Sequence, residues 1–236
     1  RMRIKLDAEF PRFTQRLLEV IYPNYISPTP SMAVARLYPN TKEGDFSKGF
    51  LVPRHTQLYS RVPPGEVSAC QFRSGQDVTL WPVEIAAAKL TGVPPDIPAT
   101  ERYLPPHVQV KGALRLKLRC VGGLNFSDLD GLDRLPIYLP GEEQIASKLF
   151  ELLHASAVAS LIGVPGQMAE RPHVVTEQAL VHEGLSAEQS LLPLDWNTWH
   201  GHNLLQEYFA CPSRFYFFAL QSLAPGLRRI EGQEAE

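Results

Sequence analysis

The stretch from Leu191 to Leu220 constrains the fold most, because it concentrates large apolar side chains between clear breaks. Its last six residues, Phe215-Tyr-Phe-Phe-Ala-Leu220, are apolar at odd and even positions alike. Successive side chains of a strand point to opposite sides of the sheet, so this run predicts a strand that is covered on both faces. The fold therefore has to provide two layers of cover at this strand.

A short amphipathic helix is predicted immediately before this strand, at residues 203–209. Asn203 suits the N-cap, and Gln206 follows it three residues later, as in a capping box. Apolar side chains four residues apart form one face, in the pairs Leu204 with Tyr208 and Leu205 with Phe209. Pro212 is expected to end the helix, because proline cannot donate to the helical hydrogen-bond ladder.

Charge and hydropathy disfavour two classes of partner. The 236 residues carry a formal net charge of -2, and lysine and arginine are scattered rather than clustered. Nucleic acid and anionic membrane surfaces are therefore disfavoured as partners. No apolar run approaches the roughly 18 residues that a membrane span needs.

The cysteines and the start of the chain bear on its location. Cys70, Cys120 and Cys211 are odd in number and far apart, which favours free buried thiols over disulfides or a zinc framework. We therefore expect a protein of the reducing cytoplasm. The start, Arg1-Met-Arg-Ile-Lys-Leu-Asp7, is not a signal peptide, and an arginine before the first methionine indicates a fragment.

A helix is predicted from Asp7 to Pro23, with Pro11 in its first turn, where a missing amide does little harm. Its expected apolar face consists of Phe13, Leu17, Leu18 and Ile21. The segment from Pro23 to Pro30 is expected to be a rigid connector without regular structure, because proline rings fix φ.

The chain from Met32 to Leu139 is predicted to be mainly β-structure. Expected strands cover residues 32–38, 49–53, 57–61, 67–73, 78–85, 110–120 and 136–139. Leu114 to Cys120 alternates strictly, so one face should pack and the basic face should meet solvent. The proline-rich segment 93–106 is the expected mobile loop, and it would divide the chain into portions 1–92 and 107–236.

A second helix is predicted after Pro140-Gly141, where Glu142 and Glu143 favour the positive end of the helix dipole. Its expected buried stripe is Ile145, Leu149, Leu152 and Leu153. Strands at 158–162 and 174–181 and a loop at 183–190 complete the chain. The predicted fold class is α+β, with strand-rich mixed sheets or a sandwich and a few short amphipathic helices.

Common catalytic and cofactor signatures are absent from the sequence, which has no P-loop, dinucleotide-binding glycine motif, nucleophile elbow or zinc-protease motif. We therefore predict no catalytic residue, no cofactor and no metal ion. The strongest metal alternative combines His200, His202 and Cys211, but a further donor is lacking. Near Trp196 and Trp199, the two histidines serve equally well as turn or packing residues.

Other candidate groups have simpler structural interpretations. Asp128-Leu-Asp-Gly-Leu-Asp133 lacks the bidentate glutamate of a calcium loop, so capping carboxylates are preferred. Cys70 has no nearby histidine, which favours an inert core thiol over a nucleophile. Glu84, Glu101 and Glu207 form no pair that indicates acid-base catalysis. The tryptophans and tyrosines could line a carbohydrate or peptide groove, although core packing is their usual role.

Five sequence blocks occur in one order along the chain. They are Leu6-Asp-Ala-Glu-Phe-Pro-Arg-Phe13 with Tyr22-Pro-Asn-Tyr25 and Pro28-Thr-Pro-Ser-Met32; Cys70-Gln-Phe-Arg-Ser74 with Asp77-Val-Thr-Leu-Trp-Pro82; Leu139-Pro-Gly141; Leu191-Leu-Pro193; and Gly201-His-Asn-Leu-Leu-Gln-Glu-Tyr-Phe-Ala-Cys-Pro-Ser-Arg-Phe215. In this order they resemble the TssF family, also called VasA or ImpG, the baseplate wedge subunits of type VI secretion systems. His200-Gly-His202 and Cys211 depart from the family's usual residues.

The resemblance implies a structural protein without catalysis or cofactor, similar to the wedge proteins of contractile phage tails. It implies TssG, a second copy of TssF, TssE, TssK and the VgrG hub as partners. The location would be a cytoplasmic baseplate that seats the sheath and tube and docks at the inner membrane complex. Because TssF chains are much longer, this sequence resembles an N-terminal to middle portion.

The apolar residues around the predicted helix and strand are the expected partner contacts. They are Leu204, Leu205, Tyr208, Phe209, Phe215, Tyr216, Phe217 and Phe218. Two other functions stay open. A roomy pocket lined by tryptophan and tyrosine would favour a ligand-binding β-module, and convergent carboxylate, histidine and serine groups in a cleft would favour a hydrolase.

Overall fold

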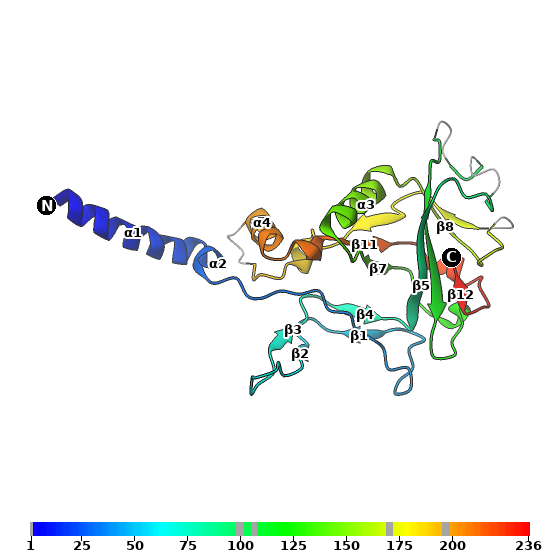
Figure 1. Cartoon of the computed structure of the whole chain (residues 1–236), viewed down its shortest axis with the longest axis horizontal. Helices are drawn as coiled ribbons and strands as arrows, with labels where there is room; N and C mark the ends of the chain where they lie inside the picture. Colours follow the sequence, from blue (N-terminus) through cyan, green and yellow to red (C-terminus); the bar gives the residue numbers. More distant parts are fainter. Residues whose placement is uncertain (1, 98–101, 105–107, 169–171, 195–198) are drawn as a thin grey trace. The chain divides into compact units, whose positions relative to one another are not determined.

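The computed structural model describes residues 2–97, 102–104, 108–168, 172–194 and 199–236. The chain divides into two units, and each unit draws on two separate segments. Unit 1 consists of residues 1–35 and 184–215, and unit 2 consists of residues 36–183 and 216–236. Figure 1 identifies the elements of both units by their labels and by colour along the sequence.

Unit 1 is built from helices. Its elements are α1 (Met2–Ile21), α2 (Pro23–Ile26), η3 (Ala187–Gln189), α4 (His200–Ala210) and η4 (Pro212–Phe215). α1 begins earlier than predicted, so Pro11 lies inside the helix and not in its first turn. An internal proline removes one backbone hydrogen bond. The helix nevertheless extends on both sides of Pro11.

Prolines set the ends of the other helices in unit 1. Pro23 follows α1 and becomes an early residue of α2, so one helical turn replaces the start of the predicted irregular connector. Pro212 follows α4, as predicted. The predicted start of α4 is wrong, because the N-cap is Trp199 and Asn203 lies inside the helix with no exposed surface.

Unit 2 begins with two paired strand sets. β1 (Phe50–Val52) pairs with β4 (Val78–Leu80), and β2 (Gln57–Tyr59) pairs with β3 (Gln71–Arg73), both antiparallel. The predicted strand at residues 32–38 is not formed, because this segment finds no strand partner in the described part of the chain. Alternating hydropathy alone cannot create a strand without a neighbour to accept its hydrogen bonds.

The longest strands form a three-stranded sheet in the order β12-β6-β5. β5 (Val83–Thr91) and β6 (Ala113–Cys120) pair along their whole length, so the proline-rich segment 93–106 lies in the connection of two paired strands inside unit 2. β12 (Glu234–Ala235) pairs with the other edge of β6. The basic face of β6 carries ion pairs that stay in contact with solvent: Arg115 with Asp96 and Glu236, Lys117 with Glu234, and Arg119 with Glu84.

The predicted apolar strand is confirmed as β11 (Phe217–Leu220), the central strand of the sheet β10-β11-β7. Its partners are β10 (Leu180–His182) and β7 (Leu135–Tyr138). Phe218 is 1% exposed and Ala219 has no exposed surface, so both faces are covered as predicted. The strand starts two residues later than expected, because η4 occupies Pro212–Phe215.

α3 (Glu143–Ser156) covers one side of this sheet's core. The predicted stripe is half wrong, because Ile145 and Leu152 are exposed. The side chains that face the core are Ala146, Leu149, Phe150 and Leu153. The buried face of α3 is therefore rotated relative to the face predicted from its most hydrophobic residues.

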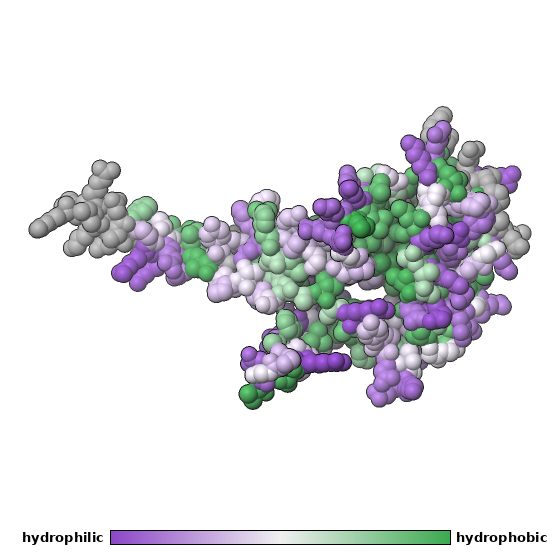
Figure 2. All heavy atoms as spheres, viewed as in Figure 1, coloured by the Kyte–Doolittle hydropathy of each residue, from purple (hydrophilic) through white to green (hydrophobic). Residues whose placement is uncertain are grey.

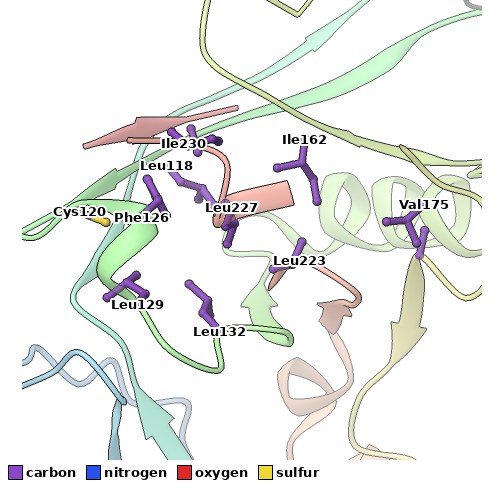
Figure 3. Packing of buried hydrophobic residues seen from close by; sticks show 12 residues of the cluster. Leu118, Cys120, Phe126, Leu129, Leu132, Ile162, Val175, Leu223, Leu227 and Ile230 are labelled. Carbon is purple, nitrogen blue, oxygen red and sulfur yellow. The ribbon is translucent and has the colours of Figure 1, made fainter. Parts of the chain in front are cut away.

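A second cluster of buried residues joins β6 to later segments of unit 2, as Figure 3 shows for Leu118, Phe126, Leu132, Leu227 and Ile230. They come from β6, η2 (Phe126–Asp128), α5 (Ala224–Leu227) and the loops beside them. β8 (Ser160–Ile162) pairs with β9 (His173–Val175) and adds Ile162 and Val175 to the cluster. The predicted strand 174–181 is therefore two strands, β9 and β10, separated by a turn in which Gln178 has φ 47°.

The predicted α+β class is confirmed by these small antiparallel sheets and the helices beside them. α1 has 20 residues and α3 has 14. Within the described residues, no helix is both long and apolar enough to cross a membrane.

Candidate interaction surface

α4 turns its polar side toward the interior of unit 1. Asn203 and Glu207 are four residues apart, hence on one face of the helix, and neither has exposed surface. Leu205, Tyr208 and Phe209 lie on the other side and are exposed. α4 therefore has the reverse of the usual arrangement, in which the apolar face of a surface helix meets the core.

Glu207 organises the loop that precedes α4. Its Oε1 accepts hydrogen bonds from the Ser190 hydroxyl at 2.8 Å and from the backbone N–H groups of Leu191 and Leu192 at 2.9 Å each. Its Oε2 forms an ion pair with the guanidinium of Arg214. The Glu207 carboxylate, for which the sequence indicates no acid-base partner, thus serves as an internal structural anchor.

Arg214 closes the same network from η4. Its Nη2 donates to the carbonyl oxygens of Gly184 at 2.9 Å and Gln189 at 2.7 Å. Burial lowers the pKa of Arg214 to about 10, which leaves the guanidinium charged at neutral pH. A buried charge needs a partner of opposite sign, and Glu207 supplies it.

Asn203 connects α4 to the end of α1. Its Nδ2 donates to the carbonyl of Pro193 at 2.9 Å, and its Oδ1 accepts from the hydroxyl of Tyr22 at 2.6 Å. Burial raises the pKa of Tyr22, which keeps this hydroxyl protonated as a donor. Gln206 donates to the Thr29 hydroxyl at 3.1 Å, so the segment after α1 is tied to α4 at two points.

The outward face of α4 is apolar and open. Phe209 is 77% exposed and Leu205 57% exposed. The Tyr208 ring contacts the rings of Phe209 and Phe215, with centroids 5.7 Å and 5.9 Å apart. Leu205, Tyr208 and Phe209 define what we call the α4 face.

α1 carries a second open apolar face. The exposed side chains Phe10, Phe13, Leu17, Leu18, Val20 and Ile21 lie on one side of the helix, and Arg12, Arg16 and Glu19 lie on the other. Figure 2 shows apolar residues in green at the surface of α1, beside hydrophilic residues in purple. Most of the stability of a helix in a protein comes from packing of its amphipathic face, so a partner for this face would also stabilise the helix.

The predicted contact residues differ in exposure and belong to both units. Leu205, Tyr208 and Phe209 are exposed on α4, whereas Leu204 and Phe215 are half-buried in unit 1. Tyr216 and Phe217 are half-buried in unit 2. Phe218 lies in the core between α3 and the sheet, so it is not available for contact, because the central position of β11 covers it on both sides.

His200, His202 and Cys211, the possible metal ligands, each have other surroundings. His200 is half-buried, and His202 is exposed with its ring 5.6 Å from that of Tyr22. The Cys211 sulfur lies 3.3 Å from the Ser213 hydroxyl. Within the described ranges, no three His, Cys, Asp or Glu side chains are placed to hold a metal ion.

The acidic segment 128–133 has the capping and pairing roles that its sequence favours. Asp128 accepts from the backbone N–H of Asn125 at 3.0 Å, and Asp133 accepts from that of Ala224 at 3.2 Å. Asp130 pairs with Arg228 at 3.1 Å. These bonds fasten the ends of η2 and α5.

The remaining candidates take ordinary positions. Glu84 pairs with Arg119, and Glu101 lies outside the described residues. Cys120 and Cys211 are buried as expected, whereas Cys70, expected as a core thiol, is exposed beside β3. Burial raises the pKa of the Cys120 thiol to about 12, so it stays protonated.

The sequence pattern does not predict Tyr22, Ser190 and Arg214 as parts of the buried network. Each is polar and lies in a stretch where apolar neighbours dominate the pattern. One signal was available: the four-residue spacing of Asn203 and Glu207 marks a polar stripe on a helix otherwise rich in aromatic residues. Such a stripe is usually the solvent side of a helix, and here it is the inner side.

Comparisons with known proteins agree with the sequence blocks. The family model described as "Type VI secretion system, TssF" matches residues 1–236. The type VI secretion system component TssF1 of Pseudomonas aeruginosa is 39% identical over 237 residues, which is 100% of this chain and 37% of that protein. The chain thus spans little more than a third of this curated relative.

A solved structure gives the same result. A chain in a cryo-electron microscopy structure of the TssK-TssF-TssG baseplate subcomplex matches with a TM-score of 0.73 and 25% identity, over 95% of this chain and 39% of that one. The resemblance predicted from the ordered blocks is confirmed. Since the family model covers every residue, the chain belongs to the TssF family of type VI secretion systems.

Proposed function

We propose that this chain is part of a structural subunit of the type VI secretion baseplate and works by binding other proteins, without catalysis. The solved relative belongs to a baseplate subcomplex of TssK, TssF and TssG, so TssK and TssG are the proposed partners. TssF1, the similar protein of P. aeruginosa, is named as a component of the same type of secretion system. We propose a cytoplasmic location, as part of a baseplate that docks at the inner membrane complex.

The structural observation that supports the proposal is the reversed orientation of α4. α4 buries Asn203 and Glu207 and exposes Leu205 and Phe209, against the usual direction of a surface helix. Exposed apolar patches bounded by polar residues are typical of protein interaction sites. The α4 face and the open face of α1 both belong to unit 1, so we propose unit 1 as the main contact region.

A second TssF copy, TssE and the VgrG hub are further proposed partners. Their support is the family resemblance of the sequence blocks. The same type of surface serves for each, since an apolar helix face packs against another helix or a groove of a partner.

The other candidate functions have less support. A hollow of about 600 Å³ in unit 2 is lined by residues 173–178, 221, 222 and 225. A carbohydrate groove is typically lined by tryptophan or tyrosine, and none of these lining residues is either. His173, Glu177 and Ser222 line it, but no hydrogen bond joins these three described side chains, as a nucleophile and its base would require.

Co-purification tests the proposal. This chain, tagged and co-expressed with TssG and TssK of the same secretion system, should retain at least one of them. Leu205→Ser and Phe209→Ser should weaken retention about tenfold if the α4 face is a contact hot spot. The matched control is Val67→Ser, because Val67 is 97% exposed and lies in unit 2.

Circular dichroism of each variant separates lost contact from lost folding. Failure to retain either protein would overturn the baseplate proposal for this chain. Retention that Leu205→Ser and Phe209→Ser leave unchanged would instead overturn the assignment of the contact to α4.

A further inference from the structure

β5 is a long edge strand. It pairs with β6 on one side, and no strand in the described part of the chain pairs with its other side. β5 spans nine residues, against two for β12 on the opposite edge of the sheet. In an antiparallel strand alternate residues direct their N–H and C=O groups away from the paired neighbour, so β5 presents a row of these groups.

The side chains of β5 do little to protect this edge. All residues from Ile85 to Leu90 are exposed, on both faces of the strand, and Leu90 is 64% exposed. Ile85, Leu90 and the three alanines between them are apolar, and Lys89 is the one charge in this run. Natural edge strands are usually short, charged, bulged or interrupted by proline. Of these features, the run from Ile85 to Leu90 has Lys89 and the register shift between Ile85 and Ala87.

The chemistry of the edge specifies its occupant. Free backbone donors and acceptors in strand geometry are satisfied by an extended segment that adds one more strand. Ile85 and Leu90 would then contact apolar side chains of that segment. A helix could cover the side chains but would leave the backbone groups without partners.

The sheet already accepts a strand from a distant part of the chain. β12 pairs through Glu234 and Ala235 with Arg119 and Leu118 of β6, more than a hundred residues earlier in the sequence. The TssF1 relative also has well over half of its length outside the matched region. Sequence-distant pairing and a large additional length of chain together favour an occupant from the same polypeptide.

We propose that the free edge of β5 pairs with a strand from the part of a full-length TssF polypeptide that lies outside these 236 residues. The sheet then has the order β12-β6-β5-new strand. The proposal rests on the family membership and not on the contacts proposed for unit 1, so either can fail without the other.

Hydrogen exchange with mass spectrometry tests the pairing. Peptides covering residues 85–90 are compared between this chain and a full-length TssF protein that contains it, each without partner proteins. The backbone amides of β5 that do not bond to β6 should exchange about tenfold more slowly in the full-length protein. The amides of β6 that bond to β5 are the internal reference, because they are paired in both proteins.

A variant that adds a charge to the free edge of β5 tests the pairing directly. Ala87→Lys in the full-length protein should restore fast exchange at residues 85–90, since a lysine opposes strand addition. Val67→Lys adds the same charge at an exposed site outside the sheet and should leave the exchange unchanged. This comparison uses the full-length protein alone, so it holds even where the shorter chain is unstable.

Three results would overturn the proposal. The first is equal exchange of β5 in both proteins, and the second is slow exchange that Ala87→Lys does not affect. The third is slow exchange only at high protein concentration or only after TssG or TssK is added, which would assign the edge to a second copy or to a partner.

Discussion

The carboxylate of Glu207 in α4 is ion-paired with the guanidinium of Arg214 in η4, and both side chains are buried within unit 1. The pair spans the break at Pro212, so it fixes how the chain turns after the helix. Both partners also bond to the loop 184–192, which therefore closes over the polar side of α4. The apolar side of the helix is left to face outward.

Breaking this pair should destabilise unit 1 strongly. Glu207→Gln or Arg214→Met leaves one buried charge without its counterpart, and such changes typically cost about 3 to 5 kcal/mol in the free energy of unfolding. Urea denaturation followed by circular dichroism measures the change. The double variant Glu207→Gln with Arg214→Met should cost less than the sum of the single changes, because no charge is then stranded.

An exposed ion pair of the same kind is the control. Arg228 and Asp130 are both largely exposed, so Arg228→Met should change the free energy of unfolding by less than about 1 kcal/mol. Equal effects of Arg214→Met and Arg228→Met would contradict a structural role for the buried pair.

Acid should weaken the attachment of α3 to its sheet. The rings of His154 on α3 and His182 on β10 are stacked with centroids 3.5 Å apart. Burial, and then the charge of His182, lower the pKa of His154 from 6.5 to about 4. The folded protein therefore holds fewer protons than the unfolded one between these values, and stability is lost as the pH falls from 6.5 toward 4.

The size of this effect follows from the partial exposure of His154. Solvent screening reduces the contribution, and we expect a loss of about 1 kcal/mol in unfolding free energy between pH 7 and pH 5. Denaturation of the wild type and of His154→Gln at both pH values isolates the contribution of this histidine. A variant with the same pH dependence as the wild type would rule it out.

Gly226 should not tolerate a larger residue. A Cβ atom at this position would lie 3.0 Å from Ile162 Cβ and Cγ2 and from His173 Cβ, in the core beside α5. Gly226→Ala should therefore cost about 1 to 3 kcal/mol through overpacking. Gly92→Ala is the control, because no heavy atom lies within 4 Å of the added Cβ. A thermal midpoint that Gly226→Ala does not lower would show that β8 and β9 shift freely.

The sequence predicted those parts of the fold that depend on local pattern. The strict alternation of Leu114 to Cys120 identified β6, and the continuous apolar run identified β11 as a strand covered on both faces. Pro212 marked the end of α4. These signals succeed because strand periodicity and proline geometry act over a few residues.

The parts that could not be predicted depend on distant contacts. Asn203 has the features of an N-cap, but it lies inside α4 because Tyr22 and Pro193 satisfy its amide. Ile145 and Leu152 are the more hydrophobic choice for the inner face of α3, yet Ala146 and Phe150 fit the sheet. For the candidate surface, the sequence selected side chains that are exposed on α4, such as Leu205 and Phe209, together with Phe218, which belongs to the core.

The last prediction concerns this chain without partners. The α4 face and the apolar face of α1 leave several large side chains in contact with water, and aromatic side chains bury about 150 to 250 Å² each when covered. We therefore expect the isolated chain to self-associate as its concentration rises, with light scattering as the measurement. Leu205→Ser combined with Phe209→Ser should shift the species toward monomer, while Val67→Ser should not. A monomer at every concentration, with all variants folded, would mean that these faces need a differently shaped partner to associate.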